Sequence, residues 1–366
     1  MPTSEFIPQM KPLFGEEERK KINEYFEEEG FITEFKRTAE FESVIANYTG
    51  AKHCIVVNNG TISLTLAAIA LGIGPGDEII VPNYTMIATP NSVKMLGATP
   101  VFIDVELDTL ALDIELVKKN ITSRTKAIIL VTPNGREPSA GITEFEKISE
   151  LTGIPIIEDA AQSLGSLYKD GRHVGRAGKL GSFSFSAPKI ISTGQGGALI
   201  TDDDLMAEKI KKLKDFGRGT GGADVHDIVG FNCKFTELQA CVGLAQMEKL
   251  PQRVLRKKEI WKNYSLHLSS IPEVKIFRHD IDNCTPWFID ILCNDRSGLV
   301  EFLKTKNIGT RTMYPRITHQ EAYKLGGDYP VTKVVEERGL WLPSMVQLSD
   351  DQIKYVTDSI SEFYCK

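Results

Sequence analysis

The chain has 366 residues and a formal net charge of −6, and 25% of its residues are charged. This length exceeds what one small core needs and suits a large domain followed by a smaller one. The acidic balance argues against a nucleic-acid-binding surface, so we expect a small-molecule partner and no nucleic acid.

The cysteines and the N-terminus indicate a cytoplasmic protein. Six cysteines are scattered without a C-x-x-C pair or a nearby His cluster, so we expect free thiols and neither a zinc site nor a disulfide framework. The N-terminal MPTSEFIPQMKPLF lacks the apolar segment of a signal peptide, and no apolar run is long enough to span a bilayer. We therefore expect a cytoplasmic location without a membrane partner.

The N-terminal third opens with helical patterns and then a strand. Residues 15–30 form a mixed-charge pattern typical of a solvated helix, and a second helical spacing precedes a strand at 53–57. Asn58, Asn59, Gly60 and Thr61 follow, just before an Ala- and Leu-rich helix that ends at Gly72. Such a turn directs helix N–H groups toward an anion, which predicts a phosphate site. A simple tight turn with a Thr cap is the alternative.

Strand and helix signals then alternate as far as residue 131. We expect strands at 78–81, 99–103 and 127–131, and helices at 85–96 and 113–120. This alternation predicts an α/β fold with a mostly parallel sheet covered by helices.

The segment from 154 to 204 carries the most informative residues. Residues 154–158 are typical of a strand buried on both faces, and Asp159 follows at its carboxyl end, where open α/β sheets bind ligands. A second strand at 181–186 leads to Lys189 on a Gly-rich loop. A lone lysine is usually solvated and a lone carboxylate often caps a helix. A crowded lysine amine that can form Schiff bases, paired with such a carboxylate, is typical of pyridoxal 5'-phosphate (PLP) chemistry.

The remaining chain predicts a separate compact domain. We expect a basic amphipathic helix at 205–216 and a mobile Gly-rich loop at 218–225. From about residue 251 come a helix at 253–268, strands at 274–277 and 287–292, a helix capped by Ser297, and a last helix opened by the capping box Ser349 to Gln352. We therefore predict a large α/β domain over 1–250 and a small α+β domain over 251–366.

The segments EDAAQSLGS (158–166) and TGQGGALITDD (193–203), with Lys189 between them, resemble the DegT/DnrJ/EryC1/StrS family of PLP-dependent sugar aminotransferases. The resemblance runs from about residue 30 to the C-terminus. It implies fold type I of the PLP enzymes, assembled as a homodimer with shared active sites. In the catalytic roles it implies, Lys189 forms the Schiff base with PLP and shuttles a proton, and Asp159 keeps the pyridine nitrogen protonated.

The same resemblance implies further cofactor contacts. Gly60, Thr61, Ser184 and the partner's Asn232 hold the phosphate, and Gln162 hydrogen-bonds the ring edge. Met86 stands where relatives place an aromatic residue on the ring face, and Tyr84 is the alternative for that contact.

Two segments are expected to contact the substrate. VTPNGREPSAG replaces the His-Leu-Tyr-Gly of many relatives and contributes Asn134 and Arg136, whereas TRTMYPRITHQEAY, which resembles a substrate-facing segment of the family, contributes Arg311, Tyr314 and His319. Tyr84 is also a candidate substrate contact.

The resemblance predicts amino transfer, with glutamate as donor, to the keto group of a nucleotide-linked 4-keto-6-deoxy sugar, as in perosamine- or viosamine-type 4-aminotransferases. A lysine at 189, where the sugar dehydratases of the family have histidine, favours transamination. The alternatives are a 3-aminotransferase, an aminotransferase for a smaller keto compound, and a non-catalytic binding or regulatory protein of the same fold. No metal is expected.

Overall fold

A seven-stranded sheet forms the centre of the larger unit in this computed structural model, which describes residues 5–28, 30–219 and 223–365. The strand order is β1-β7-β6-β5-β4-β2-β3, and all neighbours are parallel except those of β7. The predicted mostly parallel sheet is confirmed. Its strands are β1 (His53–Val57), β2 (Glu78–Pro82), β3 (Thr99–Ile103), β4 (Thr125–Val131), β5 (Ile156–Asp159), β6 (Leu180–Ser184) and β7 (Gly197–Thr201).

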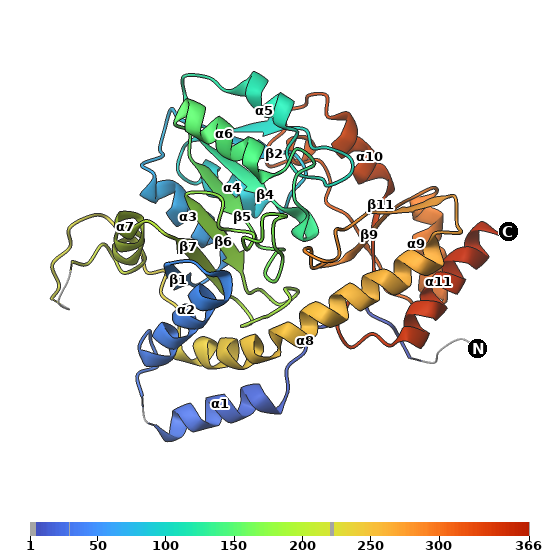
Figure 1. Cartoon of the computed structure of the whole chain (residues 1–366), viewed down its shortest axis with the longest axis horizontal. Helices are drawn as coiled ribbons and strands as arrows, with labels where there is room; N and C mark the ends of the chain where they lie inside the picture. The colour runs from blue at the N-terminus through green and yellow to red at the C-terminus, as the bar shows by residue number, and fades with distance from the viewer. Residues whose placement is uncertain (1–4, 29, 220–222, 366) are drawn as a thin grey trace.

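Helices cover both faces of this sheet, which explains its continuous apolar strands (Figure 1). One face packs against α2 (Lys36–Thr49), α5 (Ile114–Asn120), α6 (Ile142–Thr152) and the first half of α8 (Glu237–Leu268). The other face packs against α3 (Gly60–Ala70), α4 (Ala88–Lys94) and α7 (Asp204–Lys214). The N-terminal α1 (Glu16–Glu27) lies along α8.

A second, antiparallel sheet belongs to the C-terminal unit. Its order is β10-β11-β9-β8, and it shares an apolar core with the second half of α8. The elements of this unit are β8 (Val274–Ile276), β9 (Ile289–Cys293), α9 (Arg296–Thr305), β10 (Arg311–Thr312), α10 (Pro330–Arg338), β11 (Gly339–Leu342) and α11 (Asp350–Tyr364).

The two units are joined by α8 and by a shared apolar cluster. The cluster packs Tyr84 and Leu110 of the large unit against Phe277 and Trp341 of the small one. Helix α8 runs unbroken through Pro251, where the domain boundary is expected. The division into 1–250 and 251–366 therefore stays a prediction, with one rigid helix crossing it.

Several local predictions differ from the structure. The cap of α9 is Asp295, whose carboxylate accepts the Gly298 N–H at 3.0 Å, so the Ser297 cap was wrong. The capping box of α11 is confirmed. The predicted mobile loop at 218–225 includes residues 220–222, which lie outside the described residues. Within the described part of the chain, no helix is long and apolar enough to cross a membrane.

Candidate active site

A pocket of about 480 Å³ opens at the carboxyl ends of β4 and β5. Parallel sheets bind ligands at this edge because helix N-termini and strand-end side chains converge there. Every predicted cofactor residue except Asn232 lines the pocket. The lining consists of Asn59, Gly60, Thr61, Ile62, Leu64, Thr85, Met86, Ala88, Val131, Asp159, Ala161, Gln162, Ser184, Ser186, Lys189 and Gln195.

Asp159 is held as a buried, hydrogen-bonded carboxylate. It is the last residue of β5, and its oxygens accept the Thr89 hydroxyl at 2.7 Å and the Ala161 N–H at 3.3 Å. Burial raises the pKa of Asp159, whereas the Thr89 hydrogen bond and the positive charge of Lys189 oppose that rise. The side chain is thus aimed and ready to accept a positively charged partner.

Lys189 lies on the loop between β6 and β7, and this loop folds back onto the end of β6. The loop is closed by Phe185 N–H to Gly196 O at 2.8 Å and by Thr193 N–H to Phe185 O at 2.9 Å. Burial lowers the pKa of the Lys189 amine to about 8, with Asp159 opposing this effect and Arg311 adding to it. Near neutral pH the amine therefore has an appreciable uncharged fraction, which is the nucleophilic form.

The N-terminus of α3 forms an anion site beside Lys189. The Asn59 side chain accepts Ile62 N–H at 2.9 Å, and the first-turn N–H groups of Gly60 and Thr61 have no partner within their helix. Glycine is required at two close approaches. A Cβ at Gly60 would lie 2.8 Å from the Ser184 Cβ, and one at Gly197 would lie 2.6 Å from the Asn59 carbonyl carbon.

This set of groups fits PLP. Helix N–H groups and hydroxyls suit a phosphate, the Asp159 carboxylate suits a protonated pyridine nitrogen, and the Lys189 amine suits an aldehyde. Met86 lines the pocket, whereas Tyr84 is buried against Tyr314, with ring centroids 5.8 Å apart. Of Met86 and Tyr84, the Met86 thioether is therefore the side chain that contributes to the pocket wall.

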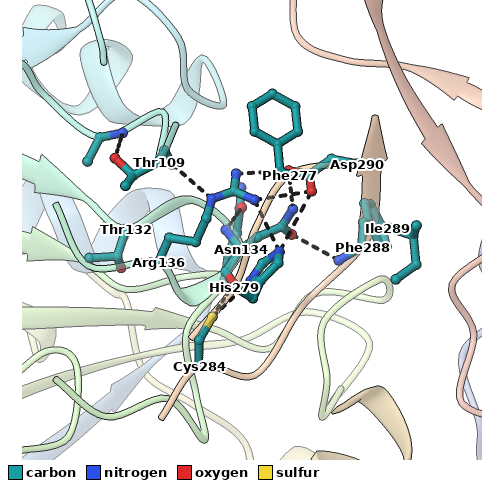
Figure 2. Close-up of polar contacts among 12 residues, drawn as sticks. Thr109, Thr132, Asn134, Arg136, Phe277, His279, Cys284, Phe288, Ile289 and Asp290 are labelled. Carbon is teal, nitrogen blue, oxygen red and sulfur yellow. Dashed lines mark hydrogen bonds and ion pairs between the residues drawn. The ribbon is translucent and has the colours of Figure 1, made fainter. Parts of the chain in front are cut away.

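The structure places Asn134 and Arg136 in a buried polar cluster (Figure 2). The Arg136 guanidinium donates to Asp290 at 2.8 and 3.1 Å, and the Asn134 amide donates to the same carboxylate at 2.5 Å. Although burial opposes it, Arg136 lowers the pKa of Asp290 to about 2, and burial lowers the pKa of His279 to about 4. The side chains of Asn134 and Arg136 both bind Asp290 and lie outside the pocket lining. Their predicted contacts with substrate therefore remain untested.

Asn134 nevertheless reaches the pocket through its backbone. Its N–H donates to Gln162 Oε1 at 2.9 Å, so the Gln162 NH₂ group is the end left to donate elsewhere. Asn134 has a left-handed backbone (φ 54°), and its side-chain oxygen accepts the Phe288 N–H. The small unit therefore holds Asn134 in place, and Asn134 in turn fixes Gln162, which lines the pocket.

Two of the three predicted substrate residues of the small unit, Arg311 and Tyr314, lie close enough to Lys189 and Asp159 to interact with their charges. The Arg311 guanidinium is exposed over the Trp341 ring at 5.4 Å, and its charge contributes to the lowered pKa of Lys189. Tyr314 packs edge-on against Trp341 at 4.8 Å, and burial raises its pKa. His319 is exposed, with Nε2 3.4 Å from Gly327 O. Their contacts with substrate remain predictions.

Asn232 lies outside the pocket of its own chain. It is exposed, whereas the next residue, Cys233, accepts the Asn58 N–H at 3.1 Å. The segment that carries Asn232 therefore borders the anion site of its own chain, and the predicted contact of Asn232 with the partner's phosphate stays a prediction.

Sequence reasoning missed two residues that touch the reactive pair. Thr89 orients Asp159, and the Trp287 ring lies under the Lys189 amine at 4.3 Å. Thr89 lies in a helix turn whose sequence does not indicate a catalytic role. Trp287 belongs to the other unit. Only the three-dimensional arrangement identifies them.

Another pocket, of about 330 Å³, lies near the ends of β6 and β7, away from Lys189. Its Arg176 pairs with Asp202 at 2.9 Å, and its Lys179 pairs with Asp203. Because these charges already have partners, this pocket lacks the reactive groups of the first.

Comparisons with known proteins agree over almost the whole chain. The model of the DegT/DnrJ/EryC1/StrS aminotransferase family matches residues 12–361. The GDP-perosamine synthase of Escherichia coli O157:H7 is 34% identical over 369 residues, covering 98% of this chain and 99% of that protein. The GDP-perosamine synthase of Vibrio cholerae is 32% identical over 375 residues, with the same coverage. The PLP form of Spr1654 from Streptococcus pneumoniae has a TM-score of 0.92 at 26% identity, covering 98% of each chain.

Proposed function

The chain belongs to the DegT/DnrJ/EryC1/StrS aminotransferase family, and we propose that it transfers an amino group from glutamate to a nucleotide-linked 4-keto-6-deoxy sugar. The predicted family, fold class and PLP-dependent aminotransferase activity are confirmed. The observation that carries the proposal is one pocket that holds Lys189, Asp159 and the α3 N-terminus together. Two GDP-perosamine synthases among the relatives support a 4-keto sugar and make GDP the first nucleotide to test.

Bound PLP supplies an electron sink for the bonds at the carbon that carries the amino group. The chain's own groups do the rest of the work. Asp159 keeps a proton on the pyridine nitrogen, because a carboxylate beside that nitrogen favours its charged form. Lys189 Nζ, uncharged once its proton is lost, would take up the proton from the carbon that carries the amino group and would later give it back. The N–H groups of Gly60 and Thr61, with the Ser184 hydroxyl, hold the phosphate.

Substrate contacts are proposed for Arg311, Tyr314 and His319. Arg311 offers a planar cation suited to a diphosphate, and Tyr314 and His319 lie on the same segment of the small unit. Asn134 and Arg136 are less accessible for this role because Asp290 holds their side chains.

A homodimer with shared sites is the proposed assembly. Large apolar side chains are exposed along a strip formed by Phe31, Ile32, Phe35, Phe216, Val229 and Phe231. The Phe216 N–H donates to Phe231 O at 2.9 Å, and Ile32 O accepts the N–H of Glu237, at the start of α8, at 3.0 Å. Asn232 lies within the strip, beside the anion site. A second copy seated there would bury the aromatic rings and receive Asn232 at its own pocket.

The test is conversion of a panel of GDP-, UDP- and dTDP-linked 4-keto-6-deoxy sugars by the purified protein with PLP and glutamate. We expect an amino-sugar nucleotide by mass spectrometry, amination at carbon 4 by NMR, and a visible absorption band that shifts when glutamate is added. Borohydride reduction followed by peptide mapping should label Lys189, and Lys189→Ala should lose both the label and the product.

Other outcomes would replace the proposal. Amination at carbon 3 would assign a 3-aminotransferase, and turnover of only smaller keto compounds would move the substrate class. A protein that binds PLP without a spectral response to any amino donor would be a non-catalytic binding protein.

A further inference from the structure

We propose that Trp287 is a positioning residue for Lys189, with its indole ring supporting the lysine ammonium and its ring N–H fixing the loop that carries the lysine. The inference rests on the proposed function, in which Lys189 holds the cofactor. It concerns the form of the enzyme in which the lysine amine is free, a form that each amino transfer must pass through.

Two contacts bring Trp287 to adjacent residues of the lysine loop. The Lys189 Nζ lies 4.3 Å from the centroid of the indole ring, within the range of a cation–π interaction. The indole N–H donates to the Pro188 carbonyl at 2.7 Å. One contact acts on the amine and the other on the backbone just before it, so together they limit where the amine can lie.

Trp287 is itself immobilised. It is only 4% exposed, its ring stacks on Phe288 with centroids 3.7 Å apart, and the Trp341 ring meets it edge-on at 6.0 Å. The Lys257 ammonium donates to its carbonyl oxygen. A side chain packed on several sides can hold a flexible lysine, whereas a mobile one could not.

The charged groups around Lys189 stabilise its ammonium form only in part, so an aromatic ring can add to that stabilisation. Among the residues that the structure describes, Asp159 is the anionic group that favours the protonated amine, and burial and Arg311 act against it. The face of an aromatic ring stabilises an ammonium without competing for its covalent chemistry. Within the described part of the chain, the titratable or charged groups that border Lys189 in the pocket or in the small void behind it are Lys11, Asp159, Arg253, Lys257 and Arg311.

The experiment separates the ring from its N–H with two variants of the PLP-free protein. Trp287→Leu removes both contacts, and Trp287→Phe keeps an aromatic face but removes the donor. Reaction of Lys189 with trinitrobenzenesulfonate, followed by peptide mapping across pH, gives the midpoint for its deprotonation. PLP capture is followed separately by its visible absorption.

For Trp287→Leu we expect the Lys189 midpoint to fall by about 0.5 to 1 pH unit, because the ammonium loses its ring partner. For Trp287→Phe we expect a smaller fall. Both variants should capture PLP roughly two- to tenfold more slowly, because the loop loses its hydrogen bond. Trp261→Leu is the matched control, since the Trp261 N–H donates to the Phe277 carbonyl at 3.2 Å, and it should change neither quantity.

Unchanged midpoint and capture rate in folded Trp287→Leu would overturn the inference. If that variant does not fold, Trp287→Phe decides the question through its capture rate, and an unchanged rate overturns the inference. Failure of the proposed function looks different, because the wild-type protein would then carry the borohydride label on another lysine or on none. The trinitrobenzenesulfonate midpoint needs no cofactor and is measured in either case.

Discussion

Asp159 and Lys189 each counteract the effect that burial has on the pKa of the other. Burial favours the neutral form of both groups, whereas the Coulomb interaction between them favours the charged forms. A bound group with a positive charge beside Asp159 would replace the partner that Lys189 now provides. Lys189 would then lose this favourable interaction and be easier to deprotonate, as its proposed role requires.

Asp159→Asn tests this division of roles. The variant keeps the size of the side chain and the Lys189 amine, so we expect PLP to bind covalently as in the wild type. Turnover should fall by roughly 100- to 1000-fold, because the preorganised charge at the ring nitrogen is lost. Steady-state kinetics at saturating PLP measure the loss, and the absorption spectrum verifies loading.

Thr89→Val provides a graded comparison for Asp159. It removes the hydroxyl that orients the carboxylate but leaves the charge, so its loss of turnover should be smaller than that of Asp159→Asn. Near-normal turnover in Asp159→Asn would remove this carboxylate from the mechanism.

At the scale of elements, the N-terminus of α2 is capped by a carboxylate from another helix. The N-cap residue of α2, Phe35, has no side-chain cap to offer. Glu237 instead accepts the N–H groups of Phe35, Arg37 and Thr38 at 2.7, 2.7 and 2.8 Å. Glu237 is also in the first turn of α8, so the positive ends of two helices share one carboxylate.

Glu237→Gln should destabilise the protein by about 2–3 kcal/mol at neutral pH. The amide has a donor end that cannot accept the N–H groups it faces, and the charge that favours both helix ends is lost. Although burial opposes it, hydrogen bonds from Thr38, Arg37 and Phe35 lower the pKa of Glu237. Urea unfolding measures the change, and Glu40→Gln on the exposed face of α2 should stay within about 0.5 kcal/mol.

The pH dependence of this effect has a definite sign. Because the carboxylate is more acidic in the folded state, its contribution is present above the unfolded pKa and is lost as pH falls through the folded one. The stability difference between wild type and Glu237→Gln should therefore shrink below about pH 4.5. A difference that grows on acidification would contradict the proposed cap.

Local patterns predicted the elements that carry their own signals. The strand ending at Asp159 and the turn before α3 follow from short stretches of sequence, and so does the Lys189 loop. The long-range partners do not: Trp287 is 99 positions from Pro188, and Asp290 is 154 positions from Arg136. Polar residues that follow a strand end were expected to face the substrate. In the structure their side chains instead bind a carboxylate of the other unit. Tertiary pairing, which local sequence does not encode, decided their place.

At the scale of the whole molecule, the apolar strip contains Asn232 and borders the anion site. A chain that leaves several aromatic rings exposed in one strip has a surface suited to association. Cys233, next to Asn232 in the chain, accepts the Asn58 N–H, and the adjacent Asn59 lines the pocket, so a copy docked on the strip would lie close to the pocket. Dimer formation and completion of the site are therefore expected to be coupled.

The coupling is tested by Asn232→Ala, alone and in mixed dimers. An amide donor to a phosphate oxygen contributes about 1.5–3 kcal/mol, so its loss should weaken PLP retention roughly 10- to 100-fold. Asn232→Ala should regain full activity when PLP is added in excess, and activity against PLP concentration measures this.

Mixing Asn232→Ala with Lys189→Ala subunits, under conditions that let dimers exchange, shows which chain each Asn232 serves. If Asn232 acts on the partner's cofactor, a mixed dimer combines both substitutions in one site and leaves the other site intact. Activity at limiting PLP should then rise above that of either parent variant. If Asn232 acts within its own chain, each site of the mixed dimer carries one substitution and no gain occurs. No gain despite verified exchange, or an active monomer in solution, would contradict the shared site.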